Sequence, residues 1–553
     1  MSNVGSLPNP GVPCVPAGVT NPSHEFDAFH YGFGVATKNA VATGSVLHPD
    51  NGDEARYVDK SGTYTKGLKQ AGAGLVDIPT FNKFRNIAYS ASGNGDLQAL
   101  GVLIGTPGSE FSKLNGPQGA FALSLAGSDS RTFVSPPSFP VLSKEYAVEL
   151  VELYWASLLR DVPFSEYEGN ATAIAAAIEL DSFGAAYKGP RDSMGKVTAK
   201  TLFRGGLTNG GTHYFAGELA GPYLSQFCLQ PTALGAQKIN QMTTTYAAGI
   251  DFMTDFTEWQ NIQNGAKPSG TITTDPVARF MRDGRALGAY TRVDQLYQAY
   301  LVAFLTMNTL GVKPNPTSPY AGYANEKAFG TFGGPDAAAT IGAVAREALN
   351  AVWYQKWLVH LRHRPESGGG IVHILKTLGS GHILKTISTF DTLNSAVLDS
   401  LALKLSHLRY GSYLLSQAFP EGSPTHPAYP TGHGAVAGAC ITVLKFFLDC
   451  DQPFAALMAP VLESALDGLS LVPYVATDKS GMTVNGELHK LAHNISFGHG
   501  IHAGIHWRDD TDWSILLGEE VALKYLQDQA YGYNEKMSVK LRKLDGSLHT
   551  ISN

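Results

Sequence analysis

The segment Ala428-Tyr429-Pro430-Thr431-Gly432-His433-Gly434, followed directly by the apolar stretch Ala435 to Leu448, is the most informative part of this chain. It predicts a helix N-terminus, where free backbone N–H groups and the positive end of the helix dipole favour an anion. Thr431 adds a hydroxyl, Gly432 lets a ligand approach the backbone, and His433 can exchange a proton near neutral pH. The segment therefore predicts an oxyanion site; the alternative is a simple helix cap with a surface histidine.

The composition of the 553-residue chain is that of a large folded protein, with 44% hydrophobic and 16% charged residues. Its net charge of −6 and the lack of a Lys/Arg stripe argue against binding to nucleic acid. No apolar run reaches the roughly 18 residues of a membrane helix, and the N-terminus shows no recognisable secretory signal. The four cysteines form no metal-binding pattern. We therefore expect a soluble, cytoplasmic protein with no membrane partner.

Helical periodicity dominates the chain from Ser143 onward, whereas residues 1–142 are rich in Gly, Pro, Ser and Asn, which indicates extended loops. Few runs alternate with a period of two, so the predicted fold is all-α. The predicted helices cover Lys144 to Arg160, Gly235 to Phe256, Arg292 to Thr309, Asp336 to Leu361, Leu393 to Leu408, Ala435 to Leu448, Phe454 to Leu466, Glu487 to Asn494 and Trp513 to Gln529, and Pro460 should kink the helix that contains it.

Twelve of the seventeen histidines lie between His360 and His506, around the predicted oxyanion site. Pro365 should end the helix that begins near Asp336, because the residue before a proline is pushed out of helical geometry. Arg364 would then be free to lie beside Lys356. A lysine and an arginine side by side suit a tetrahedral oxyanion. The alternative is a basic helix end in solvent, since cations favour helix C-termini.

His506 and Asp510 are four residues apart and would share one face of a helix. The carboxylate could then fix the tautomer of the imidazole and leave its other nitrogen for phosphorus or a metal. A zinc site made of His499, His502 and His506 is the alternative, but the sequence lacks a His-Glu-x-x-His pattern.

Three motifs in this order, Lys356 to Pro365, Pro430 to His433 and His506 to Asp510, resemble the vanadium-dependent haloperoxidases and their relatives, the type 2 acid phosphatases. The resemblance runs from about Glu152 to the C-terminus. It is closest to the bromoperoxidase-type branch of algae and bacteria, in the segments Glu152 to Phe164, Gly221 to Phe227, Trp353 to Trp357, Phe419 to Pro427 and Gly486 to Leu491. It implies two helical bundles, which we expect over residues 143–330 and 331–553, with a loop-rich N-terminal wrap over 1–142 and the vanadate site in the second bundle.

The resemblance also implies the cofactor and the reaction. Vanadate would be bound, and hydrogen peroxide would oxidise bromide or iodide to hypohalous acid, which halogenates a small organic substrate. The protein would be a homo-oligomer, a dimer or larger. Lys356, Arg364, Thr431 and Gly432 would hold the oxygens of vanadate, His433 would be the acid–base group, His506, oriented by Asp510, would bond vanadium, and His426 would be a second pocket histidine.

Two positions depart from the family pattern. Thr431 stands where the family usually has serine, and Gly500 stands where it has a second arginine, six residues before the ligand histidine. A one-residue insertion would place His499 there instead, and vanadate binding would then be weaker or more dependent on pH, because an imidazole lacks the permanent charge of a guanidinium. Two alternatives stay open: a phosphomonoesterase with His506 as nucleophile, and a family member that has lost its dependence on vanadium.

Overall fold

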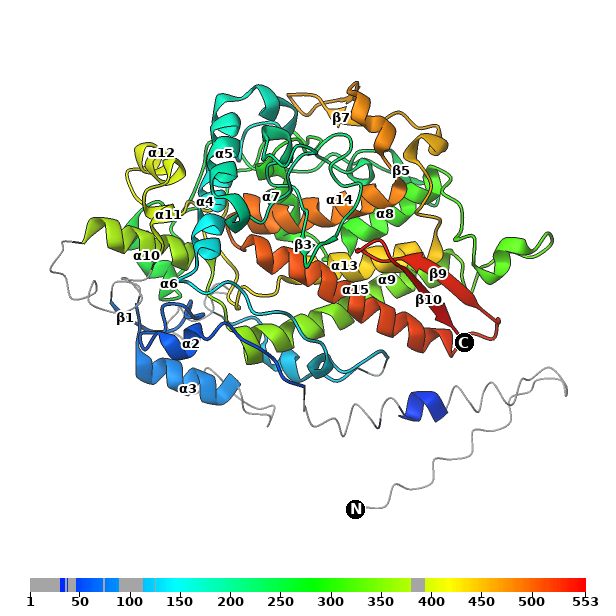
Figure 1. The fold of residues 1–553 in the computed structure, drawn as a ribbon, viewed down its shortest axis with the longest axis horizontal. Helices are drawn as coiled ribbons and strands as arrows, with labels where there is room; N and C mark the ends of the chain where they lie inside the picture. The colour runs from blue at the N-terminus through cyan, green and yellow to red at the C-terminus, as the bar shows by residue number, and fades with distance from the viewer. Residues whose placement is uncertain are drawn as a thin grey trace, which may run out of the picture.

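The computed structural model describes residues 30–34, 37, 46–72, 75–88, 113–124, 126–378 and 393–553. Within these ranges the protein is mostly helical, and its β-structure consists of short antiparallel pairs of strands (Figure 1). The all-α prediction is confirmed. Much of the predicted N-terminal loop region, including the residues on which the search for a secretory signal depended, lies outside the described residues. Among the described helices, none is long and apolar enough to cross a lipid bilayer.

The helices and strands have the following bounds. The helices are α2 (Asp53–Arg56), α3 (Ile78–Ala88), α4 (Lys144–Leu158), α5 (Ala171–Ser182), α6 (Phe256–Gln263), α7 (Gly284–Val293), α8 (Gln298–Thr309), α9 (Gly334–Tyr354), α10 (Pro365–Thr377), α11 (Ser395–Leu398), α12 (Leu401–Tyr410), α13 (Gly432–Phe447), α14 (Val484–Phe497) and α15 (Arg508–Ala530). The strands pair as β1 (Gln70–Gly72) with β2 (Leu75–Val76), β3 (Thr208–Asn209) with β4 (Thr212–His213), β5 (Thr232–Leu234) with β6 (Gln237–Ile239), β7 (Leu462–Ser464) with β8 (Leu471–Pro473), and β9 (Ser538–Arg542) with β10 (Leu548–Ser552).

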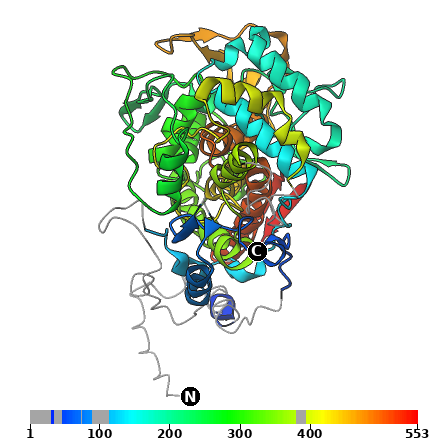
Figure 2. The same cartoon turned by 90° about the vertical axis from the view of Figure 1, so that its left-hand side faces the viewer.

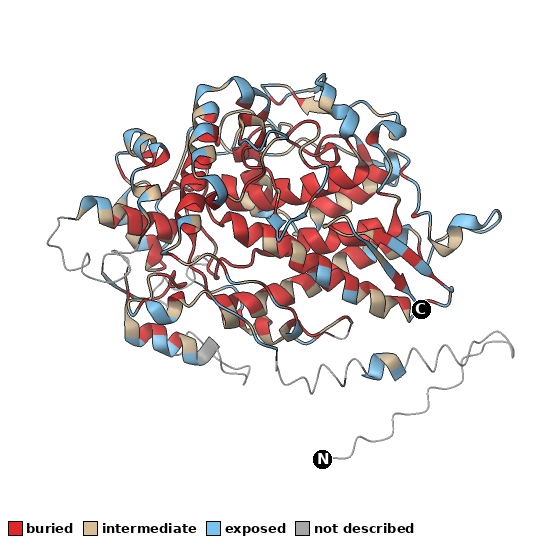
Figure 3. Ribbon diagram, viewed as in Figure 1, coloured by how far each residue is buried: buried red, intermediate tan, exposed pale blue. Residues whose placement is uncertain are grey.

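Helix α13 lies at the centre of the protein. All 16 of its residues are buried, as expected for a helix that is apolar on every side (Figure 3). It packs against α9, α14 and α15, and the view along these central helices shows the other elements arranged around them (Figure 2). The N-terminus of α13, which carries the motif around His433, is therefore held on several sides at once.

The backbones of α13 and α15 touch at two glycines. A methyl group on Gly438 would overlap the carbonyl oxygen of Ile515, and one on Gly518 would overlap that of Ala435. This close approach is possible only because neither glycine has a side chain. It brings the start of α13 next to the start of α15, where the backbone N–H of Thr431 donates to a carbonyl oxygen in the first turn of α15, 3.1 Å away.

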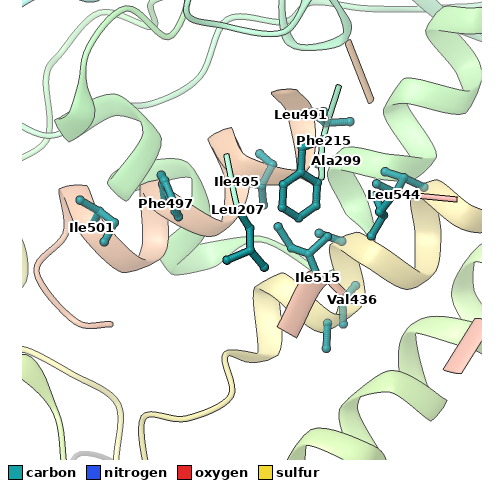
Figure 4. Close-up of a cluster of buried hydrophobic side chains, with 14 of the residues drawn as sticks. Leu207, Phe215, Ala299, Val436, Leu491, Ile495, Phe497, Ile501, Ile515 and Leu544 are labelled. Carbon is teal, nitrogen blue, oxygen red and sulfur yellow. The ribbon is translucent and has the colours of Figure 1, made fainter. Parts of the chain in front are cut away.

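The largest hydrophobic cluster of the described residues extends through most of the helical part of the protein. Its members include Leu153 from the first predicted bundle and Val436 from the second. Figure 4 shows part of this core, where Val436 of α13 and Ile515 of α15 lie near Leu491 and Ile495 of α14. The bundle boundaries at residues 143–330 and 331–553 stay a prediction.

Two of the predicted helices are wrong. The range Gly235 to Phe256 contains the turn and second strand of the β5–β6 hairpin and then a loop, and Gly235 and Gly249 have φ angles of 57° and 76°, which a helix cannot contain. The range Phe454 to Leu466 has a short 3₁₀ turn, which Met458 with φ 53° ends before Pro460, and then strand β7. The other predicted helices lie on helices of the structure, some of them split or shifted at their ends.

Candidate active site

The structure brings the predicted site residues together at the N-terminus of α13. They come from five places in the fold: the end of α9, the end of α14, the start of α10, the loop before α13 with the first turn of that helix, and the loop before α15 with its first turn. Most of these side chains are almost fully buried, with exposed fractions of 0% for Lys356, Arg364 and Thr431 and 1% for His506. The site therefore lies in the interior of the protein, and the surface alternatives for these residues are excluded.

Lys356 lies in a π-helical turn, Gln355–His360, that continues α9. Leu361, with φ 43°, ends this turn, so the helix ends before Pro365, which instead opens α10. The prediction that Pro365 ends the helix is wrong. The Nζ atom of Lys356 donates to the carbonyl oxygens of the two residues before Tyr429, at 2.8 and 2.6 Å. Burial, followed by the charge of Arg364, holds the pKa of Lys356 well below its usual range.

Arg364, the residue before α10, faces two histidines of the site. Its Nη1 donates to Nε2 of His506 at 2.8 Å and its Nη2 donates to Nδ1 of His426 at 3.0 Å. Burial lowers the pKa of Arg364 to about 10. Two buried cations so close together repel each other, and an anion between them would remove that repulsion.

His506 has one nitrogen fixed and the other available. Its Nδ1–H donates to Oδ2 of Asp510 at 2.9 Å, so Nε2 carries the lone pair that accepts from Arg364. Burial, then the charges of Arg364 and Lys356, hold the pKa of His506 well below its usual range. The ring is therefore neutral with a lone pair turned toward the pocket, which is the state that a metal ligand needs.

The pairing of His506 with Asp510 is confirmed, although the two residues do not share a helix. Helix α15 begins at Arg508, so Asp510 reaches back from its first turn and also accepts from the backbone N–H of Trp507 at 3.1 Å. The other oxygen of Asp510 accepts from Arg362 at 2.7 Å. Sequence reasoning missed Arg362, which stands two residues before Arg364.

Arg362 is the centre of a buried ion cluster behind the pocket. It pairs with Asp510, with Asp509 and with Glu149, the last at 3.0 Å. This cluster fixes the carboxylate of Asp510 and, through it, the tautomer of His506.

His433 lies against His499 and pairs with an acidic residue that the sequence did not indicate. The two imidazole rings stack with 4.0 Å between their centroids. The Nε2 atom of His433 lies 3.1 Å from Oδ1 of Asp294, directly after α7. Asp294 is 139 residues away in the chain, and its own surroundings in the sequence carry no motif.

His426 lies between Arg364 and the aromatic ring of Trp353, whose centroid is 4.9 Å from that of the imidazole. Burial and the Arg364 charge hold the pKa of His426 well below its usual range. His426 therefore lines the same pocket as a neutral imidazole.

His499 lies in the site beside His433 and His506, and its equivalence to the family's second arginine stays a prediction. It lies in a π-helical turn, Gly498–His502, which follows α14 and accommodates an additional residue. Its ring centroid is 5.7 Å from that of His506. Gly500 could not carry a side chain there without a shift, because an added Cβ would lie 3.2 Å from Cβ of His506. Burial and the neighbouring His433 hold the pKa of His499 well below its usual range.

The zinc alternative is wrong. His502 turns away from the pocket, and its Nε2 lies 2.9 Å from the hydroxyl of Tyr223. No group of three or more His, Cys, Asp or Glu side chains in the described residues could hold a metal ion.

The residues present suit an oxyanion. The hydroxyl of Thr431 and Nδ1 of His499 are buried and have no hydrogen-bond partner in the protein. The first backbone N–H groups of α13, beginning with Gly432, have no acceptor within the helix. The oxygens of an oxyanion would accept hydrogen bonds from these donors and would pair with the two cations. Its central atom could bond the lone pair of His506.

The chain is similar to known vanadium-dependent bromoperoxidases over most of its length. The chain is 30% identical to a vanadium-dependent bromoperoxidase of Ascophyllum nodosum, over 94% of this chain and 91% of that protein. It is 33% identical to a vanadium-dependent bromoperoxidase of Corallina pilulifera, over 76% of this chain and 77% of that protein. Among solved structures, the vanadate-dependent bromoperoxidase AnII from Ascophyllum nodosum superposes with a TM-score of 0.85 at 26% identity, covering 100% of this chain and 94% of that chain. No family model matches the chain.

The fold and the site define a helical enzyme with a buried oxyanion site and one histidine, His506, whose Nε2 lone pair faces Arg364 in that site. The sequence similarity covers most of the chain and identifies the family within this class. The chain belongs to the vanadium-dependent bromoperoxidase family.

Proposed function

We propose that this enzyme binds vanadate at the N-terminus of α13 and uses hydrogen peroxide to oxidise bromide or iodide to hypohalous acid. The three relatives named as vanadium-dependent bromoperoxidases support this function, and they do not favour the phosphomonoesterase alternative or a loss of vanadium dependence. The observation that carries the proposal is the neutral His506, whose lone pair lies in a pocket with two buried cations.

The residues of the site have different roles in holding the cofactor. His506 is the ligand to vanadium, and Asp510 keeps its Nδ1 protonated so that Nε2 stays available. Lys356 and Arg364 supply positive charge to the oxygens of vanadate. Thr431, Gly432 and His499 add hydrogen-bond donors. When bound, vanadate supplies the Lewis acid that activates peroxide toward a halide.

His433 is the acid–base group of the site. Its pairing with Asp294 fixes Nε2 as the proton-bearing nitrogen, so Nδ1 is the atom at which a proton is gained or lost. His426, held by Arg364, is the second pocket histidine and orders the polar groups near the halide. Burial of all these groups excludes bulk water from the pocket and strengthens each charge interaction.

Two further properties belong to this proposal. The AnII structure is described as homohexameric, and we expect this chain to form a homo-oligomer too, which light scattering would measure. A cytoplasmic location is supported by the three described cysteines, Cys228, Cys440 and Cys450, which are buried and unpaired as in a reducing compartment.

The test is an assay of the purified enzyme with vanadate, hydrogen peroxide and bromide, read out as tribromide. We expect turnover that depends on all three additions. Hydrolysis of a phosphate monoester without any halide oxidation would overturn the proposal.

A further inference from the structure

A small cavity lies apart from the candidate vanadate site. Its volume is about 90 Å³, and its walls come from the 3₁₀ turn Phe164–Gly169, the segments 199–204 and 221–229, and β7. Its described lining contains none of the residues assigned to vanadate. The cavity has room for several water molecules but is much smaller than the roughly 300 Å³ at which pockets for drug-sized ligands begin. It therefore suits a ligand of a few heavy atoms.

Arg204, in the wall of this cavity, is a buried cation whose hydrogen bonds to the protein are long. Its exposed fraction is 5%. Its Nη1 and Nη2 donate to the carbonyl oxygens of Glu218 and Gly221 at 3.2 and 3.3 Å, and its Nε has no hydrogen-bond partner in the protein. Burial lowers the pKa of Arg204. Because buried charges are normally paired in proteins, Arg204 favours an anion in this cavity.

The carboxylates whose charge acts on Arg204 are bound by other groups. Glu218 pairs with His493 at 2.7 Å and accepts from a backbone N–H at 2.6 Å. Glu487 pairs with Lys490 at 2.6 Å. In the part of the chain that the structure describes, no carboxylate forms an ion pair with Arg204. The anion that Arg204 favours would therefore come from a ligand.

Tyr167 adds a second donor to the lining, and aromatic rings form its apolar part. The hydroxyl of Tyr167 is buried and has no hydrogen-bond partner in the protein. Its ring centroid lies 6.4 Å from that of Tyr223, and the guanidinium of Arg204 lies 5.2 Å from the same Tyr223 ring. Phe164 stacks on Tyr223 with 3.7 Å between centroids, and Leu224 extends this apolar surface. Two donors beside apolar surface suit a carboxylate with a short aliphatic chain.

The other charged side chains of the cavity favour a single negative charge on the ligand. Lys200 and Arg282 are each already paired with an aspartate, at 2.6 and 3.2 Å. Glu168 and Glu463 also belong to the lining. These carboxylates would repel a sulfate or phosphate dianion more strongly than a monoanion.

We propose that this cavity is a binding site for a short aliphatic monocarboxylate, held by Arg204 and Tyr167 through its carboxylate and by the stacked aromatic pair through its alkyl group. The site does not depend on the proposed function. It adjoins the candidate vanadate site only indirectly, because the hydroxyl of Tyr223 lies 2.9 Å from Nε2 of His502, the last residue of the π-helical turn after α14. A bound monocarboxylate would lie behind that turn and outside the vanadate site.

Propionate is the probe, and propionamide, which has the same shape without the charge, is the comparison. Each is titrated with the full chain, without vanadate or peroxide, and its binding is followed by ligand-observed NMR. We expect propionate to bind with a Kd of about 1 mM and propionamide at least about tenfold more weakly.

Three variants locate the bound propionate. Arg204→Met keeps the length of the side chain and removes the charge, so propionate should bind at least about tenfold more weakly. Tyr167→Phe removes only a hydroxyl without a partner, so this variant should fold even where Arg204→Met does not, and should bind propionate about threefold more weakly. The matched control is Tyr474→Phe, in the same lining, because its hydroxyl already donates to Asp478 at 2.9 Å, and it should bind propionate like wild type.

The candidate vanadate site could also take up a carboxylate, so the titration is repeated with Lys356→Met. We expect propionate binding to be unchanged in this variant, whether or not vanadate binds at Lys356. The inference is overturned by any of four results: no binding of propionate to wild type, equal binding of propionamide, full binding in Tyr167→Phe and Arg204→Met, or loss of binding in Lys356→Met. Displacement of propionate by an equal concentration of bromide or sulfate would also overturn it, because the ligand would then be a simple inorganic anion.

Discussion

Two buried histidines near the C-terminus, His493 and His506, have pKa values that their surroundings shift in opposite directions. Both nitrogens of His493 contact carboxylates, with Glu218 at 2.7 Å and Asp512 at 3.0 Å. Burial by itself lowers the pKa of His493, but these two carboxylates outweigh burial and raise its pKa to about 10. His506 has a single carboxylate partner, Asp510, and faces Arg364 on its other side.

Burial lowers the pKa of both histidines, and only at His493 do neighbouring carboxylates outweigh this effect. With two carboxylates, His493 is a cation that holds α14 to its neighbours. With one carboxylate and two nearby cations, His506 stays neutral and keeps a lone pair. We therefore expect substitutions at His493 to affect stability and substitutions around His506 to affect cofactor binding.

The largest effect is expected for His506→Ala. Removal of the only proposed covalent ligand should abolish vanadate binding and reduce bromide oxidation to background. Equilibrium dialysis with vanadate and the tribromide assay measure the two losses. Undiminished turnover in this variant would show that His506 is not the ligand.

His493→Gln is expected to destabilise the fold by about 3–5 kcal/mol, because two buried carboxylates lose their cation. Denaturant unfolding measures this change. The matched control is His213→Gln at an exposed position of β4, which should change stability by less than about 0.5 kcal/mol. An unfolding free energy equal to that of wild type would mean that His493 is not a structural cation.

The pH dependence of stability gives the same variant a second readout. The folded pKa of His493 is about 10, above its ordinary value of 6.5, so its contribution is complete below pH 6.5 and is lost as pH rises through 10. Wild type should therefore lose stability between these pH values more steeply than His493→Gln. Parallel curves would contradict the assignment of charge.

Asp510→Asn is expected to weaken vanadate binding by about 10- to 100-fold, the usual effect of removing a carboxylate behind a metal-bound histidine. The amide can no longer hold the Nδ1–H tautomer of His506 with a full negative charge. Dialysis measures the affinity, and a thermal melt of the same sample shows whether the variant is folded. A vanadate affinity equal to that of wild type in a folded variant would show that Asp510 has no role in cofactor binding.

The smallest effect is expected for His499→Arg, which should tighten vanadate binding by about tenfold. Burial and His433 keep the pKa of His499 low, so the wild-type imidazole adds no charge at neutral or alkaline pH, whereas a guanidinium stays charged at both. The longer side chain can extend into a cavity that His499 lines. Unchanged or weaker binding of vanadate at pH 7 and above would show that a positive charge at this position does not strengthen binding.

Much of the site could be predicted because its residues stand at helix ends, where sequence signals are local. Thr431, Gly432 and His433 open α13, and Lys356 lies close to the end of the helical segment that precedes Pro365. The pairing of His506 with Asp510 was predicted from a spacing of four, which also fits a loop followed by the first turn of a helix.

The remaining contacts could not be predicted because they depend on tertiary packing. Asp294 reaches His433 from 139 residues away, and nothing near it in the sequence marks it. Arg362 and Arg364 stand in the same motif, and spacing alone cannot show which arginine faces the pocket and which faces Asp509. The β5–β6 hairpin was mistaken for a helix because its apolar residues are too few to reveal a period.

The glycine contacts between α13 and α15 limit how this protein can change during evolution. Gly438 and Gly518 touch no ligand, yet a single methyl group at either would push the two helices apart and separate Thr431 from the start of α15. Selection for activity would then act on these positions as strongly as on the pocket itself. A map of tolerated substitutions would show two intolerant regions, one around His506 and one along the α13–α15 contact, and only the first would reveal the chemistry.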